Sequence, residues 1–240
     1  MSQVALLTVT HDLEGKNIEL FKQVQKGLED IYGELFITIS DLSSTELVKE
    51  MERSRFKVKI IPKEGAAQAR REVVKFGLTG QSQHFHYCDF DRLLTWSKNH
   101  LDELKNIVSV MPNHDYLILG RTERAMNTHP MEWIETEKIT NKICSLELGK
   151  EVDITAGSCS FSRECAKYIN IFSKEKMTDA EWAMIIHRIA KLSVDYAQVE
   201  GLEYHEDTNG IPRIISDSEK WLGRLQLSLI ISQTALKIGK

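Results

Sequence analysis

The sequence contains few of the features that mark secreted or membrane proteins. Its 240 residues include only four cysteines and four prolines. None of the cysteines forms a CxxC pair, so we expect reduced thiols. No apolar run reaches the roughly 20 residues that cross a bilayer, and no basic leader with a cleavage site precedes the first apolar segment. We therefore expect a soluble, cytoplasmic protein without a transmembrane segment.

The sequence also lacks an excess of charge of one sign. Lysine and arginine total 31 and aspartate and glutamate total 35, which gives a formal net charge of −4. The charges are interspersed and form no basic block, so nucleic acid is not an expected partner. Hydrophobic residues make up 42% of the chain, enough for a large core. Without a linker rich in proline, glycine or serine, residues 1–240 are predicted to form one domain.

Apolar segments of strand length alternate with amphipathic helical segments through the first half of the chain. The expected strands cover residues 4–10, 35–40, 57–61, 85–88 and 116–119. The expected helices cover residues 17–31, 45–53, 66–76 and 92–110. This alternation predicts an α/β fold with a mostly parallel central sheet and helices on both faces. Ligands of such sheets bind beyond the carboxyl ends of the strands.

The second half of the chain has a less regular pattern. We expect helices over residues 131–148 and 178–194, a strand within 153–161, and a polar loop over 203–210. A closing helix over 216–238 begins with a capping box of Ser216 and Glu219. Its apolar side chains are expected to pack in the core, with docking on a membrane or a partner as the alternative; they are Trp221, Leu222, Leu225, Leu229 and Ala235.

Two carboxylates directly follow the expected fourth strand. Asp89 and Asp91 lie between this strand and the next helix. The sheet holds the end of a strand rigidly, and carboxylate oxygens suit a Mg²⁺ or Mn²⁺ ion that also binds substrate phosphates. In the simpler alternative, Asp91 caps the helix and Asp89 is a loop residue. Their position after a fourth strand favours the metal site.

Two earlier loops carry groups that suit a nucleotide. Asp41 follows the second strand, where it can accept a hydrogen bond from a base; an Asx turn is the alternative. Gly65 opens a segment of small residues that leads to Arg70. The forked guanidinium of Arg70 suits a diphosphate, although Arg70 and Arg71 also read as a solvated basic pair at a helix N-terminus.

Together, these three loops resemble the donor-binding half of glycosyltransferases with the GT-A fold, especially the family 2-like enzymes. The matching segments are 41–44 (Asp-x-x-Ser), 65–70 (Gly-x-x-x-x-Arg) and 89–91 (DxD), in the order of that family. Leu42, Arg71 and Arg92 depart from the family's usual residues. The resemblance implies a GT-A-like nucleotide-binding sandwich, with a donor-binding half over 1–125 and an acceptor half with the closing helix over 126–240.

The resemblance also implies roles for the matching residues. Asp41 would contact the base and Arg70 the diphosphate. Asp91 would bind Mn²⁺ or Mg²⁺ directly, and Asp89 would contact the ribose or the metal. The implied donor-binding residues lie at the ends of strands or in the loops that follow; they are Thr8, Thr10, Asp41, Arg70 and Asp89.

Three residues of the acceptor half are further candidates. Asp179 or Glu181 would be the catalytic base, although Glu181 also reads as part of a capping box with Thr178. His205 would be a third metal ligand, with a surface loop near the turn at Asn209 as the alternative. His84 and His86, two apart on a strand, are more simply packing residues than a metal pair.

These features predict a metal-dependent glycosyltransferase of the hexosyltransferase type. It would move a sugar from a UDP- or GDP-linked donor to an acceptor hydroxyl. A non-catalytic nucleotide- or sugar-binding protein on the same fold is one alternative. A sugar nucleotidyltransferase is the other, and it ranks lower because the loop after the first strand lacks a glycine-rich segment with a basic residue.

Overall fold

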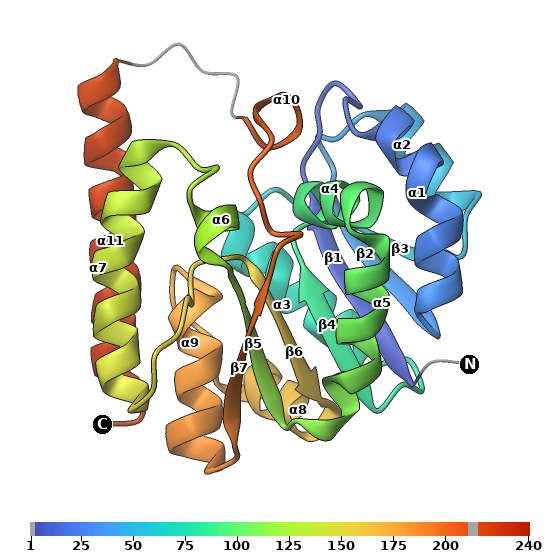
Figure 1. Cartoon of the computed structure of the whole chain (residues 1–240). Coiled ribbons are helices and arrows are strands. Elements are labelled where there is room, and N and C mark those ends of the chain that lie inside the picture. Colours follow the sequence, from blue (N-terminus) through green and yellow to red (C-terminus); the bar gives the residue numbers. More distant parts are fainter. Residues whose placement is uncertain (1–2, 211–215) are drawn as a thin grey trace.

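The computed structural model describes residues 3–210 and 216–240. Within these residues, seven strands form one sheet in the order β3-β2-β1-β4-β6-β5-β7. The strands are β1 (Val4–Thr10), β2 (Glu34–Ser40), β3 (Phe56–Ile61), β4 (His84–Cys88), β5 (Tyr116–Arg121), β6 (Ser158–Ser162) and β7 (Val194–Val199). The sheet includes strands from both halves of the sequence (Figure 1).

The sheet is mostly parallel, as the alternation of strands and helices predicts. Only β6 is antiparallel to its neighbours, β4 and β5. Strand order reverses at β1, which pairs with β2 on one side and β4 on the other. The carboxyl ends of β1 and β4 therefore border the crevice where sheets of this kind bind ligands. The loop after β4 begins at Asp89.

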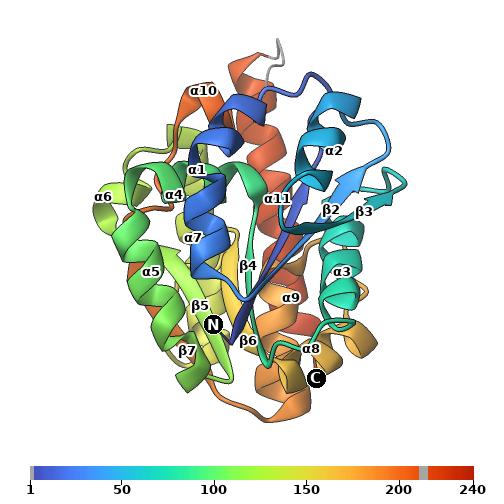
Figure 2. The same cartoon turned by 90° about the vertical axis from the view of Figure 1, so that its right-hand side faces the viewer.

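Helices cover both faces of the sheet (Figures 1 and 2). In the first half they are α1 (Ile18–Ile31), α2 (Thr45–Glu52), α3 (Ala66–Gly77), α4 (Phe90–Asn99), α5 (Leu101–Val110) and α6 (Glu123–Met126). In the second half they are α7 (Met131–Leu148), α8 (Arg163–Phe172), α9 (Thr178–Met184), α10 (Glu206–Asn209) and α11 (Asp217–Lys237). A 3₁₀ turn (Met111–Asn113) and a π-helix (Ile185–Ala190) complete the described helical segments.

The alternating side chains of the strands fill two separate cores. Ala5 and Leu7 of β1 point into the core beneath α3, α8 and α9. Val4 and Leu6 of the same strand point into the core beneath α1, α2, α4 and α5. Successive side chains of a strand point to opposite faces, so a strand covered on both sides is apolar throughout. This explains why β1 reads as a continuous apolar run.

Two helical predictions were wrong in extent. The helix expected over 92–110 is two helices, because His100 leaves helical geometry at φ −138° and ψ 46°. The helix expected over 178–194 ends in a π-helical turn at Lys191, whose φ is +59°, and strand β7 follows. Helix α8 and strand β7 were not expected from the apolar pattern. Strand β7 lies at an edge of the sheet and is only partly buried, which weakens that pattern.

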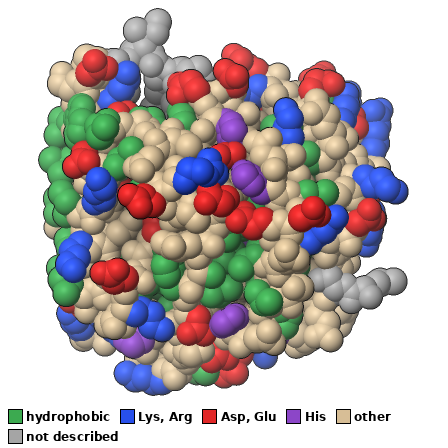
Figure 3. Space-filling view, in the orientation of Figure 1, with side chains coloured by type: hydrophobic (Ala, Val, Ile, Leu, Met, Phe, Trp, Pro, Cys, Tyr) green, Lys and Arg blue, Asp and Glu red, His purple; other side chains and the backbone are tan. Residues whose placement is uncertain are grey.

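The apolar face expected on the closing helix does not pack in the core. Trp221, Leu222, Leu225 and Leu229 are 42–55% exposed, whereas Ala235 is buried as expected. Helix α11 instead buries the side of the helix that carries Ser228, Ile231, Ser232, Thr234 and Ala235. Green side chains along the left edge of Figure 3 mark the exposed apolar surface over α7 and α11. The capping box of Ser216 and Glu219 is confirmed.

Two predictions from the composition can be compared with the described residues. All four cysteines are free and buried, as expected. No helix in the described parts of the chain is long and apolar enough to cross a membrane.

Candidate active site

The carboxyl end of β4 presents both aspartates of the triplet at the start of α4. Asp89 is the N-cap residue of this helix, yet its side chain makes no capping hydrogen bond. Asp91 lies in the first turn of the same helix. The alternative in which Asp91 caps the helix is therefore wrong, and both carboxylates interact with residues from other parts of the chain.

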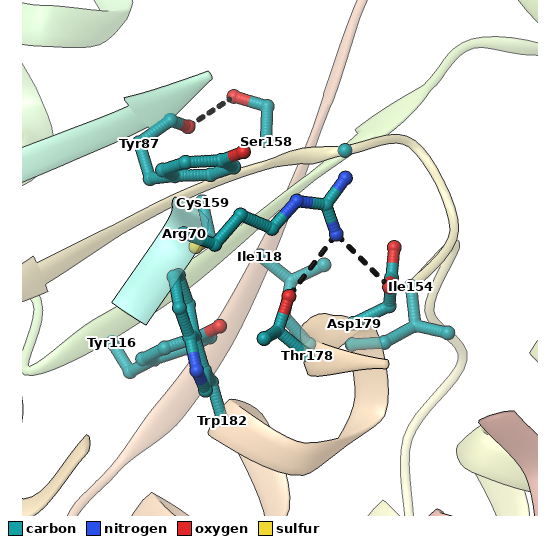
Figure 4. A pocket seen from close by; sticks show the side chains of 11 residues that line it. Arg70, Tyr87, Tyr116, Ile118, Ile154, Ser158, Cys159, Thr178, Asp179 and Trp182 are labelled. Atoms are coloured by element: carbon teal, nitrogen blue, oxygen red, sulfur yellow. Dashed lines mark hydrogen bonds and ion pairs between the residues drawn. The ribbon is translucent and has the colours of Figure 1, made fainter. Parts of the chain in front are cut away.

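Arg70 joins segments from the two halves of the chain. Its Nη2 donates to Asp89 Oδ2 at 2.8 Å. Its Nη1 lies 3.1 Å from Asp179 Oδ2 and 3.0 Å from Thr178 Oγ1 (Figure 4). The arginine is on α3, Asp89 follows β4, and the other two residues open α9. Arg70 lies about one turn into α3, which begins at Ala66, and its side chain is buried.

The two carboxylates stabilise the charge of Arg70 in a buried place. Burial alone lowers the pKa of this guanidinium, but the charges of Asp89 and Asp179 outweigh it and raise the pKa well above its ordinary value. Tyr87 lies against the same group, with its ring centroid 5.5 Å from Arg70 Cζ. The Tyr87 hydroxyl also donates to Asp89 Oδ1. Arg70 is thus held rigidly beside the strand ends.

Asp91 is linked to the loop that carries His205 through Asn209. The Asn209 amide donates to Asp91 Oδ2 at 2.8 Å and accepts a hydrogen bond from the His205 backbone at 2.9 Å. The His205 ring lies 3.1 Å from Glu203 and 3.1 Å from Asn99. The loop after β7 therefore returns to the carboxyl end of β4, although these segments are more than 100 residues apart in the sequence.

The carboxylates here fit a metal ion whose coordination shell is completed by substrate oxygens. Among the described residues, no group of three or more His, Cys, Asp or Glu side chains is arranged to hold a metal. Mg²⁺ is commonly bound through one or two carboxylates together with phosphates and water. Asp91 supplies such a carboxylate. Asp89, in contrast, already binds Arg70 and Tyr87.

Gly157 lies against the triplet from the turn before β6. Its φ is +76°, in the region that favours glycine. A Cβ atom at this position would lie 3.0 Å from Asp89 Oδ2, and the Gly157 carbonyl accepts from the Asp89 backbone N–H at 3.4 Å. Gly157 thus allows the chain to pass close to Asp89.

The two candidate bases occupy different surroundings. Asp179 lines the cavity beside Asp89 and Arg70. Glu181 is fully buried, and its carboxylate accepts from the Ser173 hydroxyl at 2.5 Å and from the backbone of Glu175 at 2.7 Å. Glu181 therefore anchors the loop before α9. The capping box expected from Thr178 is also wrong, because α9 begins at Thr178 and its hydroxyl accepts from Arg70.

The predicted nucleotide contacts are spread over three strand ends. Thr8 is fully buried, and its hydroxyl donates to the Cys88 carbonyl at 2.8 Å, so this side chain joins β1 to β4. Thr10 ends β1 and is partly exposed. Asp41 is exposed after β2, where it accepts from the backbone of Lys63 at 3.1 Å. Their contacts with a nucleotide stay predictions.

His86 is a packing residue, as the simpler interpretation holds. Its ring lies 2.6 Å from the Tyr32 hydroxyl and 3.0 Å from the Ser158 hydroxyl. Burial lowers the pKa of His86 to about 3. The ring is therefore neutral at pH 7 and stabilises the contact between β4 and β6.

A cavity of 280 Å³ opens beside the triplet. Asp89, Asp91, Arg70 and Asp179 line one part of it. The remaining wall comes from α4, α7 and α11, and includes Arg92, Trp133, Glu137, Arg224 and Ser228. None of these wall residues was predicted from the sequence to line the site. In the sequence, Asn209 indicates only a turn, and Arg92 is only a departure from the family pattern.

Comparison with solved structures agrees with this architecture. One match is glucosyl-3-phosphoglycerate synthase from Mycobacterium tuberculosis in complex with Mn²⁺, UDP and phosphoglyceric acid. It has 13% identity, with 98% of this chain and 78% of that chain covered, at a TM-score of 0.62. Another is mannosyl-3-phosphoglycerate synthase from Rubrobacter xylanophilus, with 10% identity, 97% and 72% coverage, and a TM-score of 0.57.

The chain has the GT-A fold. The likeness extends over nearly the whole chain, so it includes residues of both halves. A structure of the Mycobacterium tuberculosis enzyme with Mn²⁺, UDP-glucose and phosphoglyceric acid also matches, at 12% identity and a TM-score of 0.58, over 94% of this chain and 80% of that one. No family model and no curated protein matches the sequence.

Proposed function

We propose that the chain is a metal-dependent glycosyltransferase that moves a sugar from a nucleotide-diphosphate donor to an acceptor hydroxyl. The observation that carries the proposal is the junction at Arg70, which brings Asp89 and Asp179 together beside a cavity of 280 Å³. The GT-A fold supports the proposal, because the similar structures include enzymes solved with Mn²⁺ and UDP-glucose. We infer UDP as the nucleotide on that likeness, and GDP is the alternative.

The residues of the site have distinct tasks in this proposal. Asp91 holds the cation, with His205 on the neighbouring loop as a further ligand. The metal ion, when bound, offsets the negative charge of the leaving diphosphate. Arg70 donates hydrogen bonds toward the same phosphates, and Asp89 and Tyr87 hold the guanidinium in place. Asp41, Thr10 and the backbone of β1 border the nucleoside.

Asp179 is the proposed base for a transfer that inverts the sugar. Its carboxylate lines the cavity, is only 8% exposed, and is oriented by Arg70 at 3.1 Å. A general base must lie within hydrogen-bond reach of the hydroxyl whose proton it accepts. Glu181 does not fit this role, because its oxygens already accept hydrogen bonds from residues 173–175. A transfer that retains the sugar's configuration needs no base on that face.

The donor site can be tested by calorimetry with UDP in the presence and absence of Mn²⁺. We expect metal-dependent binding in the wild type, and a loss of the metal dependence in Asp91→Asn. Asp102→Asn is the matched control, since Asp102 is 94% exposed and lies away from the cavity. Absence of UDP and GDP binding to the wild type with Mn²⁺ or Mg²⁺ would contradict the proposal.

The catalytic proposal needs a second measurement. UDP release from UDP-glucose, followed over hours with and without acceptor hydroxyls, reports transfer and slow hydrolysis. We expect Asp179→Asn to lower this rate while UDP affinity is kept. Binding without any release in the wild type would instead support the non-catalytic alternative.

A cytoplasmic location stays a prediction, which the four free, buried thiols support.

A further inference from the structure

Three arginines are more than nine-tenths buried in the described part of the chain, and their partners differ. Arg70, Arg92 and Arg121 are 8%, 8% and 3% exposed. Arg70 and Arg121 each bind two carboxylates. Arg92 has no carboxylate within 4.0 Å among the described residues, and residues 1–2 and 211–215 contain no Asp or Glu. Burial of a guanidinium without an anion is unfavourable, since nothing offsets the lost hydration.

Two aromatic rings lie beside the guanidinium of Arg92. Its Cζ lies 5.4 Å from the ring centroid of Tyr204 and 5.8 Å from that of Trp133. Within the described residues, its side chain donates one hydrogen bond, from Nη1 to the Glu203 carbonyl at 3.3 Å. A guanidinium has five N–H donors along its edge. Arg92 lines the 280 Å³ cavity, so the remaining donors are available to a ligand there.

A second guanidinium reaches the same indole ring from α11. Arg224 Cζ lies 3.9 Å from the Trp133 centroid. Its Nη2 binds Glu137, but its Nε is buried without a hydrogen-bond partner in the described chain. His129 adds no charge, because burial and then the nearby arginines Arg121 and Arg92 lower its pKa to about 3. Among the described residues, Arg92 therefore forms no ion pair with a carboxylate.

We propose that Arg92, with Trp133 and Arg224 beside it, binds a carboxylate or phosphate group of a substrate in the cavity. This inference rests on the proposed function and narrows the class of substrate. The anion belongs either to the sugar of the donor or to the acceptor, and it is a second anion besides the diphosphate. The flat guanidinium can bind two oxygens of such a group at once. The aromatic rings keep it oriented for this contact.

Two probes distinguish the sources of the anion. The donor arm compares UDP-glucuronic acid with UDP-glucose, which differ by one carboxylate, in the presence of Mn²⁺. The acceptor arm measures binding of 3-phosphoglycerate to the protein saturated with Mn²⁺ and UDP. Each titration is made on the wild type, Arg92→Gln, Arg92→Lys and the control Arg53→Gln. Arg53 is 74% exposed on α2's C-terminal side, away from the cavity.

In at least one arm, we expect Arg92→Gln to lower the affinity for the charged probe about 10-fold or more, as is usual when a charge-assisted hydrogen bond is lost. Arg92→Lys should recover part of the affinity for the charged probe. Arg53→Gln should lose none of this affinity. The affinity for UDP, which reports the donor site, should stay within about twofold of the wild type in Arg92→Gln. Equal binding of both charged probes to the wild type and Arg92→Gln would overturn the inference.

The melting temperature of the unliganded protein gives an independent readout. Because Arg92 has no ion pair to lose, Arg92→Gln should keep or raise the melting temperature, whereas a structural role would lower it. A thermal shift by the charged probe of the arm that responds, UDP-glucuronic acid with Mn²⁺ or 3-phosphoglycerate with Mn²⁺ and UDP, should be larger in the wild type than in Arg92→Gln. Failure of both UDP and GDP to bind would overturn the proposed function, while shifts by both charged probes that are equal in the two proteins would overturn this inference.

Discussion

Two buried ion clusters, one at the end of β5 and one at the end of β4, differ in what surrounds them. At the end of β5, Arg121 binds Asp153 at 2.8 Å and Glu137 at 2.7 Å, and all three side chains are 8% exposed or less. At the end of β4, Arg70 binds Asp89 and Asp179, and Asp89 is 27% exposed to the cavity. Of the first cluster, Glu137 lines the cavity but is only 5% exposed. The second cluster is more open at Asp89, which is the arrangement expected where a ligand completes a site.

The two clusters differ in whether the buried charges stabilise the fold or are available to a ligand. Arg121 has four hydrogen bonds to carboxylates, including one from its backbone, and a further one to Thr155. Burial lowers the pKa of Arg121, but Asp153 and Glu137 outweigh this and raise it above its ordinary value. We therefore expect loss of Arg121 to affect folding first, and loss of Arg70 to affect ligand binding first.

The largest expected effect is on stability, in Arg121→Gln. The substitution leaves Asp153 and Glu137 buried without their cation, which costs about 3–5 kcal/mol in comparable sites. Urea unfolding, with Arg53→Gln as control, measures the loss. A change below about 1 kcal/mol, the range of surface ion pairs, would mean that the cluster is hydrated rather than closed.

The next effect is on binding, in Arg70→Gln. We expect UDP affinity in Mn²⁺ to fall about 10- to 100-fold, since the variant loses the charged donor beside the diphosphate. Calorimetry on the folded variant, checked by its melting temperature, provides the measurement. Unchanged affinity would place Arg70 with Arg121 as a purely structural residue and remove the contrast between the clusters.

A smaller loss of stability is expected in Glu181→Gln. The carboxylate holds the backbone of residues 174–175 and the Ser173 hydroxyl, and each such hydrogen bond contributes about 1–3 kcal/mol when the acceptor is charged. Asp179→Asn is the matched variant on the same helix, and it should change UDP release more than unfolding. The reverse pattern would make Glu181 the base.

The last expected effect, which is smallest near neutral pH and grows as the pH falls, is a dependence of stability on pH that arises in both regions. His129, near Arg121 and Asp153 of the first cluster, and His86, on the strand β4 that leads to the second cluster, each have a pKa lowered to about 3, mainly by burial. Below pH 6.5 the unfolded chain binds protons that the folded chain does not. Stability should therefore fall by about 1.4 kcal/mol per pH unit for each histidine as the pH drops toward 4.

Unfolding in urea at pH 7.5, 6.5, 5.5 and 4.5 gives this slope. His129→Gln should reduce it by the share of one histidine below pH 6.5 and leave it unchanged above. A slope that is the same in the variant and the wild type would show that His129 titrates normally in the folded protein.

The fold of the first half could be predicted because each of its elements carries a strong local pattern. Strand β1 is apolar throughout, and α1 buries Phe21, Val24 and Leu28 at helical spacing. Edge strand β7 could not be predicted, since only its end residues Val194 and Val199 are buried. The order of motifs at Asp41, Arg70 and Asp89 also indicated the GT-A fold, because each lies next to a strand end.

The sequence by itself determined the alternation of elements, the free thiols and the place of the aspartate triplet, since these depend on residues close together in the chain. The tertiary structure alone decided which polar residues meet. It joined Arg70 to Asp179, linked Asp91 to Asn209, buried Glu181 and exposed Leu225. The contacts of Arg70 with Asp179 and of Asp91 with Asn209 join residues more than 100 positions apart, and the surroundings of Glu181 and Leu225 depend on how the helices pack. A buried arginine without a carboxylate within ion-pair distance, such as Arg92, is recognisable only once every neighbour has its position.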